Sequence, residues 1–229
     1  MHPIVLFLFA SVIFGPILWI RFTFWRYRND IKELPGSGGE LARHLIRRFK
    51  LEGVSVEETI AGQDHYDPKE KMVRLSPNNF HGKSLTAIAV AAHEVGHAIQ
   101  FHREEPTCKL FLKYFPLAKT IQRAGIGLIS LPFFSLLFAV PTLSLLALSL
   151  VAAVMIASAI VHLIILPQEW DASFNKAMPI LDEGDYIDKK YMPQIRGILR
   201  AAALTYFASA LADVVRCWRW GGLFRGLRF

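Results

Sequence analysis

The stretch AAHEVGHAIQ, residues 91–100, holds two histidines four positions apart, with a glutamate directly after the first. On an α-helix, positions i and i+4 lie about one turn apart on the same face, so His93 and His97 can direct their imidazole nitrogens toward one point. Zinc binds such nitrogens, and Glu94 lies one position further round the helix, where it can act on a metal-bound water without being a ligand. The H-E-x-x-H pattern therefore predicts a zinc-binding helix of the kind found in metalloproteases.

The residues around this motif predict the extent of the helix. Ser84 is a suitable N-cap, and the helical pattern continues to about Phe101, before Pro106. Gly96, inside the motif, leaves room for another backbone to approach. Chance spacing in a helix that merely packs is the alternative, but two histidines and a glutamate are costly to bury without a metal or other partners. We therefore favour the metal site.

A small β-structure is predicted before the motif helix. Residues 54–60 (VSVEETI) and 72–76 (MVRLS) alternate as strands do, and DHYDPKEK (64–71) has the composition of a turn. Residues 40–50, after the linker ELPGSGG (33–39), have apolar side chains four apart and predict a short amphipathic helix. The chain is thus mainly α with a small β-hairpin or sheet, and the MVRLS strand is expected to offer its edge to a peptide substrate.

Two apolar regions predict membrane segments. Residues 3–20 carry no charge, and the basic, aromatic sequence RFTFWRYR follows at 21–28. An uncleaved anchor is favoured over a signal peptide, which would have a basic start and small residues at its exit. Residues 124–168 contain no Asp, Glu, Lys or Arg, enough for two spans with a turn at Pro141–Ser144. The sequence therefore predicts an N-terminal transmembrane anchor and a transmembrane helical hairpin, with helices near 124–140 and 145–166.

The charge distribution predicts the orientation. The 229-residue chain has a formal net charge of +7, with 53% hydrophobic and 20% charged residues. Its basic residues cluster between the anchor and the hairpin and again after the hairpin, whereas the hairpin tip has none. Because cytoplasmic loops of membrane proteins are rich in Lys and Arg, we expect these clusters in the cytoplasm, together with the motif helix. The positive charge thus needs no nucleic-acid partner, and the sequence lacks the interleaved basic and aromatic motif of a nucleic-acid reader.

Four segments are expected along the chain. They are the transmembrane anchor (1–28), a cytoplasmic part of a metallopeptidase domain with the motif helix (29–123), the transmembrane hairpin (124–167) and a C-terminal part of the domain (168–229). The last of these ends in an apolar stretch, but Arg200 and Asp213 bracket too few residues for an ordinary span. An interfacial or core helix is favoured there over a further short span.

A zinc hydrolase needs a third protein ligand and an open position for water. Glu169 is favoured because it directly follows the apolar region, where the chain returns to the side of His93. Glu104 and Glu105 are too near the motif to fold back easily, and His162 lies within the apolar region. The downstream candidates considered are Glu104, Glu105, His162, Glu169, Asp171, Asp182 and Glu183.

Two segments carry a family resemblance. DHYDPKEKMVRLSPNNFHGKSLTAIAVAAHEVGHAIQ (64–100) and LPQEWDASFNKAMPIL (166–181) resemble the YugP-type neutral zinc metallopeptidases of bacterial membranes, and the similarity extends over about residues 34–208. The resemblance implies a zinc-dependent peptidase with Glu94 as catalytic base. The zinc ligands that it implies are His93, His97 and Glu169.

A more distant likeness is to the membrane zinc proteases of the HtpX and Ste24 types, whose third ligand lies in an E-x-x-A-D pattern. Here Ser173 replaces the final Asp of that pattern, so Asp171 is a candidate for the carboxylate that hydrogen-bonds a ligating histidine. An oxyanion-stabilising or substrate-side group is also needed. The candidates for it are His65, Tyr66, His81 and Tyr206.

These observations predict a membrane-bound, zincin-like metalloendopeptidase with one Zn²⁺ per chain. It is expected at the cytoplasmic face of the bacterial cytoplasmic membrane, in contact with the lipid bilayer, where it cleaves peptides or proteins, including membrane proteins. Two alternatives stay open. An intramembrane site-2-type protease is suggested by LDEGD (181–185), and a non-catalytic zinc-binding membrane scaffold would use the same histidines.

Overall fold

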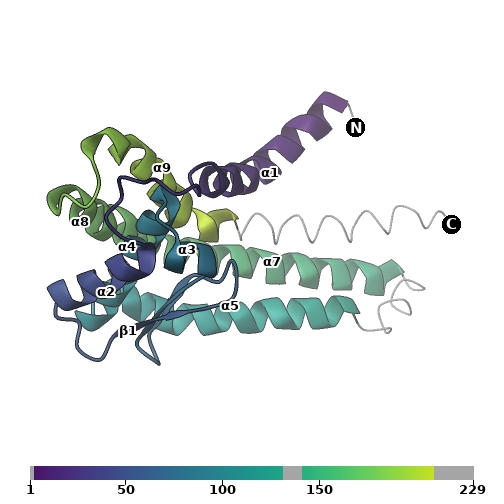
Figure 1. Ribbon diagram of the computed structural model, residues 1–229. Coiled ribbons are helices and arrows are strands. Elements are labelled where there is room, and N and C mark those ends of the chain that lie inside the picture. Colours follow the sequence, from purple (N-terminus) through teal and green to yellow (C-terminus); the bar gives the residue numbers. More distant parts are fainter. Residues whose placement is uncertain (1–2, 131–140, 209–229) are drawn as a thin grey trace. The chain divides into compact units, whose positions relative to one another are not determined.

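The computed structural model describes residues 3–130 and 141–208 of the chain (Figure 1). These residues belong to two compact units. One unit, here called the motif unit, comprises Leu18–Lys109 and Pro167–Thr205. The other, here called the helical unit, contains the described residues of 1–17, 110–166 and 206–229. His97 and Glu169 both belong to the motif unit, although more than 70 positions separate them in the sequence.

The motif unit is built around helix α4 (Leu85–His102), which packs against α2 (Gly38–Arg48) and α9 (Met192–Ala203). Helix α2 begins with a capping box, in which the Ser37 side chain accepts from Glu40 N and the Glu40 carboxylate accepts from Ser37 N. Leu41 and Leu45 are buried in the core of the unit. The short amphipathic helix predicted at 40–50 is confirmed.

Three strands form a small sheet in the order β1-β3-β2. The strands are β1 (Ser55–Glu58), β2 (His65–Asp67) and β3 (Met72–Leu75), with β1 parallel and β2 antiparallel to β3. Strand β3 therefore pairs on both sides and has no edge for a substrate, so the prediction that MVRLS offers an edge is wrong. The prediction of a turn over 64–71 is wrong at its start, because His65–Asp67 is a strand.

The chain enters the C-terminal part of the motif unit through the end of α7 (Pro141–Trp170) and continues directly into a π-helix, η1 (Asp171–Ala177). Ile195, Ile198 and Leu199 of α9 are fully buried. Of the apolar stretch predicted at 201–212, the first three residues complete α9 and residues 209–212 lie outside the described part. The remaining elements are α3 (Pro77–His81), α8 (Met178–Glu183) and the 3₁₀-helix η2 (Lys189–Tyr191).

The helical unit contains the first part of α1 (Pro3–Arg26) and most of α5 (Pro106–Ser130) and α7. Val161 and Ile165 of α7 are buried against Phe111, Phe115 and Tyr206. Residues 131–140, which include the end of the helix predicted at 124–140, lie outside the described residues. The turn predicted at Pro141–Ser144 is wrong, because these residues form the first turn of α7.

The predicted membrane segments need a correction. Within residues 3–130 and 141–208, no helix combines the length and the apolar character that a membrane crossing requires. Such a crossing takes about 20 predominantly apolar residues, and α5, for example, carries Lys109, Lys113, Lys119 and Arg123. The predicted transmembrane anchor and transmembrane hairpin are therefore wrong. The mainly helical fold class with a small sheet is confirmed.

Candidate metal centre

Helix α4 carries three residues of the candidate site. Its N-terminus is capped by Ser84, whose side chain accepts a hydrogen bond from Ala87 N at 3.1 Å, as predicted. His93, Glu94 and His97 are all buried, along with almost every other residue of the helix. The small alanines around them allow neighbouring elements to pack closely on all sides. Three ionisable side chains are therefore held away from solvent on one rigid helix.

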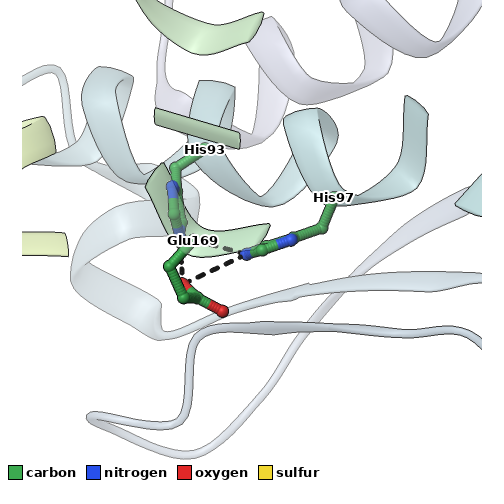
Figure 2. Close-up of side chains that lie close together, drawn as sticks. All are labelled: His93, His97 and Glu169. Carbon is green, nitrogen blue, oxygen red and sulfur yellow. Dashed lines mark hydrogen bonds and ion pairs between the residues drawn. The ribbon is translucent and has the colours of Figure 1, made fainter. Parts of the chain in front are cut away.

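Glu169, near the end of α7, completes the group. It is buried, and its Oε2 lies 3.3 Å from His93 Nε2 and 3.4 Å from His97 Nε2. The two Nε2 atoms are 3.2 Å apart. Figure 2 shows the carboxylate of Glu169 directed at both imidazole rings, which extend from α4 toward it. The three residues thus present their ligand atoms to one point from two elements.

The dimensions of this group fit zinc. A tetrahedral ion with bonds of 2.0–2.1 Å separates its ligand atoms by about 3.3–3.4 Å, and the three observed separations lie close to that value. Two imidazole nitrogens and a carboxylate oxygen are also a set that catalytic zinc sites use. His93, His97 and Glu169 could therefore hold a metal ion. Among the residues that the structure describes, no fourth His, Cys, Asp or Glu joins this group.

The other ring nitrogens of the two histidines are also hydrogen-bonded. His93 Nδ1 lies 3.0 Å from Ser173 Oγ, and His97 Nδ1 lies 3.0 Å from Gln100 Oε1. Ser173 thus contacts a histidine of the group at the position where the E-x-x-A-D pattern has Asp. Asp171 contacts neither ring, but its Oδ2 accepts a hydrogen bond from Gln100 Nε2 at 2.7 Å. The sequence reasoning missed Gln100, although its place three residues after His97 put it on the same helix face.

Gly96 explains how the segment after Glu169 can approach α4. A Cβ atom at this position would lie 2.8 Å from the backbone oxygen of Ala172 and 3.3 Å from Lys176 Cβ. Both neighbours belong to the π-helix η1, and π-helices occur often at functional sites. The prediction that Gly96 leaves room for another backbone is confirmed. This contact brings Ser173 within reach of His93.

Burial and mutual charge shape the electrostatics of the group. Burial raises the pKa of Glu94. Burial acts to raise the pKa of Glu169 as well, but the charge of His97 and the contacts with both imidazoles hold it near 2. For His97, burial acts to lower the pKa, and the Glu169 carboxylate outweighs this and raises it to about 9. Without a metal, the group is thus held by a buried ion pair between His97 and Glu169.

The other candidates for a third ligand lie elsewhere. Glu105 forms an ion pair with Lys176 at 3.0 Å, and Glu104, Asp182 and Glu183 are exposed. His162 belongs to the helical unit, where its Nδ1 lies 2.7 Å from the backbone oxygen of Ser158. The LDEGD segment ends α8 and contributes no residue to the group.

The four substrate-side candidates each make different contacts. The Nδ1 atom of His65 lies 2.7 Å from the backbone oxygen of Gln63, and the exposed His81 pairs with Glu58 at 2.9 Å. Tyr206 belongs to the helical unit. Tyr66 is half-buried, and its ring contacts Phe101 of α4 at 5.7 Å between centroids. Burial raises the pKa of Tyr66 to about 12, so its hydroxyl stays a hydrogen-bond donor over the physiological range.

Comparison with known proteins identifies the family of the chain. A family model described as "Putative neutral zinc metallopeptidase" matches residues 2–225, nearly the whole sequence. The chain belongs to this family. The resemblance noted from the sequence is therefore confirmed, and the chain is a zinc metallopeptidase by family.

One relative shares 32% identity with the chain over 226 residues, which cover 96% of both proteins. It is the "Putative membrane protease YugP" of Bacillus subtilis (strain 168). No solved structure matches the chain significantly. The family relationship was thus found by sequence, and the structure adds the spatial arrangement of the site residues.

Proposed function

We propose that the protein is a zinc-dependent metalloendopeptidase that binds one Zn²⁺ per chain through His93, His97 and Glu169. The observation that carries this proposal is the triangle of buried ligand atoms, with sides of 3.2, 3.3 and 3.4 Å. Three protein ligands leave the fourth position of a tetrahedral site free for water, which distinguishes a catalytic site from a structural one. Bound there, zinc would lower the pKa of water to about 7 and polarise the scissile carbonyl.

Glu94 is the proposed general base. Glu94 is a buried residue of α4, and its charge interacts with both His93 and His97. It is therefore placed to accept the proton of the attacking water and to deliver that proton to the leaving amine. The raised pKa that burial gives Glu94 suits both steps, because a base with a pKa nearer to neutrality also returns the proton readily.

We propose that the substrate binds as an added strand along β2. This strand lies at an edge of the sheet and packs against α4, whereas β3 is the central strand. An extended peptide that pairs with a free edge gains main-chain hydrogen bonds without a requirement for a particular sequence. The side chain of Tyr66, directed at Phe101, would then flank the bound peptide.

The proposed place of action is the cytoplasmic side of a bacterial membrane, with peptide or protein substrates that include membrane proteins. Two observations support it: the name of the Bacillus subtilis relative and the positive net charge of +7. Anionic lipids of the cytoplasmic leaflet attract Lys and Arg near the surface. A flotation assay with anionic and neutral vesicles tests this part, since binding to neither would contradict it.

The catalytic proposal is tested with the purified full-length chain and the variant Glu94→Gln. Zinc content is measured by mass spectrometry, and hydrolysis is assayed on casein and on unfolded membrane proteins. We expect equal zinc in both proteins and a loss of cleavage of roughly 10²–10⁴-fold in the variant. The exposed Glu52→Gln is the matched control and should cleave as wild type does.

Each other outcome has a defined meaning. Equal cleavage by wild type and Glu94→Gln would exclude Glu94 as the general base. Stoichiometric zinc in a wild-type protein that cleaves nothing would favour the non-catalytic scaffold. Absence of zinc from the wild-type protein would overturn the metal site itself.

A further inference from the structure

Gln100 is a buried polar residue one turn beyond His97 on α4, and it lies at the centre of a hydrogen-bond chain. Its side chain has no exposed surface. The amide nitrogen Nε2 donates to the backbone oxygen of Gln168 at 2.9 Å and to Asp171 Oδ2 at 2.7 Å. The amide oxygen Oε1 faces His97 Nδ1 at 3.0 Å. All three contacts lie within the motif unit.

These contacts determine which way the amide faces. A side-chain NH₂ group has two hydrogens, and here both meet groups that can only accept, a carbonyl and a carboxylate. The reversed amide would place its oxygen against both acceptors. The atom facing His97 is therefore the amide oxygen, which cannot donate, and so His97 Nδ1 must carry the hydrogen.

The consequence for His97 is a defined tautomer. A neutral imidazole with its hydrogen on Nδ1 has its lone pair on Nε2, the atom that faces Glu169 and His93. The contact at His93 differs, because the Ser173 hydroxyl both donates and accepts and so specifies no tautomer by itself. Of the two histidines, only His97 has its tautomer determined by a partner atom that can accept but cannot donate.

The orientation of Gln100 is supported from the side of the π-helix. Asp171 Oδ2, the oxygen that receives the Gln100 bond, also pairs with Lys176 Nζ at 2.8 Å. Lys176 in turn pairs with Glu105 at 3.0 Å, just after the end of α4. Asn175 Nδ2 donates to the other carboxylate oxygen, Oδ1, at 2.7 Å, and so takes no part in the contact with Gln100. This series of polar contacts, from Glu105 through Lys176 and Asp171 to Gln100, thus joins η1 to α4 beside the metal group.

We propose that Gln100 is a positioning residue that holds His97 in the Nδ1–H tautomer, so that Nε2 is available to the metal. Asp171 and Lys176 hold the Gln100 amide in the required direction. This inference rests on the proposed zinc site. It gives Asp171 an indirect role, through Gln100, in place of the direct contact with a ligating histidine that the sequence suggested. Partners of this kind raise metal affinity by 10–100-fold in metalloproteins generally.

Two variants at one position separate this role from packing. Gln100→Met fills a similar volume but replaces the amide oxygen that faces His97 with a thioether sulfur, a much weaker acceptor. Gln100→Glu keeps an acceptor for Nδ1–H but loses both donated bonds and places a carboxylate against Asp171. Asn175→Ala is the matched control, because it removes a contact to Asp171 that does not involve Oδ2.

The measurements are the zinc dissociation constant, by competition with a chelator, and the ¹⁵N shifts of the histidine rings in the zinc-loaded protein. We expect Gln100→Met to weaken zinc binding by about 10–100-fold and to lose the single Nδ1–H pattern of His97. Gln100→Glu should bind zinc at least as tightly as wild type despite lower thermal stability, and Asn175→Ala should match wild type. An equal loss of zinc affinity in Gln100→Met and Gln100→Glu would show that Gln100 acts through packing, and would overturn the proposal.

Failure of this inference can be told apart from failure of the proposed function. If Gln100→Met binds zinc as wild type does while Glu94-dependent hydrolysis persists, the positioning role is overturned and the peptidase stands. If zinc affinity depends on Gln100 but no hydrolysis occurs, the positioning role stands and the peptidase fails. If the wild-type protein binds no zinc, both are overturned.

Discussion

Substitution of Gly96 by alanine tests the close contact between α4 and the π-helix. The added Cβ would lie 2.8 Å from the backbone oxygen of Ala172, where ordinary contacts begin at 3.4 Å, so this oxygen must retreat by about 0.6 Å. A second contact, to Lys176 Cβ at 3.3 Å, tightens as well. The obstacle is backbone rather than the end of a flexible side chain, and therefore the whole of η1 must shift.

Two opposing effects determine how much Gly96→Ala changes the free energy of unfolding. Alanine in place of a helical glycine gains about 0.8–1 kcal/mol of helix propensity. Overpacking of a closely packed interior loses about 1–3 kcal/mol. We expect overpacking to prevail, because no flexible group can yield, and the metal-free Gly96→Ala protein to be less stable by about 1–2 kcal/mol. Its zinc affinity should also fall, since η1 carries Ser173, the partner of His93.

Gly197 provides a matched control on α9. It is a helical glycine with nothing within 4 Å of its would-be Cβ, so Gly197→Ala should stabilise the protein by about 0.5–1 kcal/mol. The assay is urea unfolding of both variants and wild type without metal, followed by chelator competition for zinc. If Gly96→Ala is stabilised as much as Gly197→Ala, helix propensity alone sets the stability of both variants, and the contact between Gly96 and η1 is not close enough to oppose an added methyl group.

Three further predictions concern the same unit. Burial raises the pKa of Glu94, so its ionisation in the folded state reduces stability as the pH rises above the ordinary value of 4.5. Metal-free Glu94→Gln should therefore melt higher than wild type at pH 7, with a difference that shrinks toward pH 4; an unchanged difference would contradict this. His97, with a pKa of about 9, carries a proton at pH 7.5 and loses it when zinc binds, so calorimetry in buffers of different ionisation enthalpy should show about one proton released. No proton release on zinc binding at pH 7.5 would argue against the His97–Glu169 pair. The same proton on His97 stabilises the metal-free fold below pH 6.5, and this contribution to stability disappears as the pH rises through about 9. Finally, Ser84→Ala removes the cap of α4 and should lower the free energy of unfolding by about 1 kcal/mol in urea titrations, whereas no change would mean that the cap is replaced by another group.

The sequence predicted the helical parts of the site because their signals are local. The H-E-x-x-H spacing, the cap at Ser84 and the apolar pattern of residues 40–50 each depend on neighbours within one or two turns, and the structure contains both helices. Glu169 was favoured because of its place after the apolar region, and the structure brings it to both histidines.

The parts that failed depend on contacts distant in sequence. Strand β2 has only three residues, too few for an alternating pattern, and its Asp-rich surroundings have the composition of a turn. The parallel pairing of β1 with β3 is not encoded by either strand alone. The π-helix after Glu169 has no sequence signature, and the hydrogen bonds of Gln100 join residues about 70 positions apart. Such features follow from tertiary packing.

The most direct test of the zinc site is anomalous diffraction at the zinc edge from crystals of the full chain. We expect one zinc per chain, at about 2.0–2.1 Å from His93 Nε2, His97 Nε2 and a carboxylate oxygen of Glu169, with the fourth position open to water beside Glu94. A zinc ion bound elsewhere, or one whose fourth position is closed by another protein ligand, would contradict it.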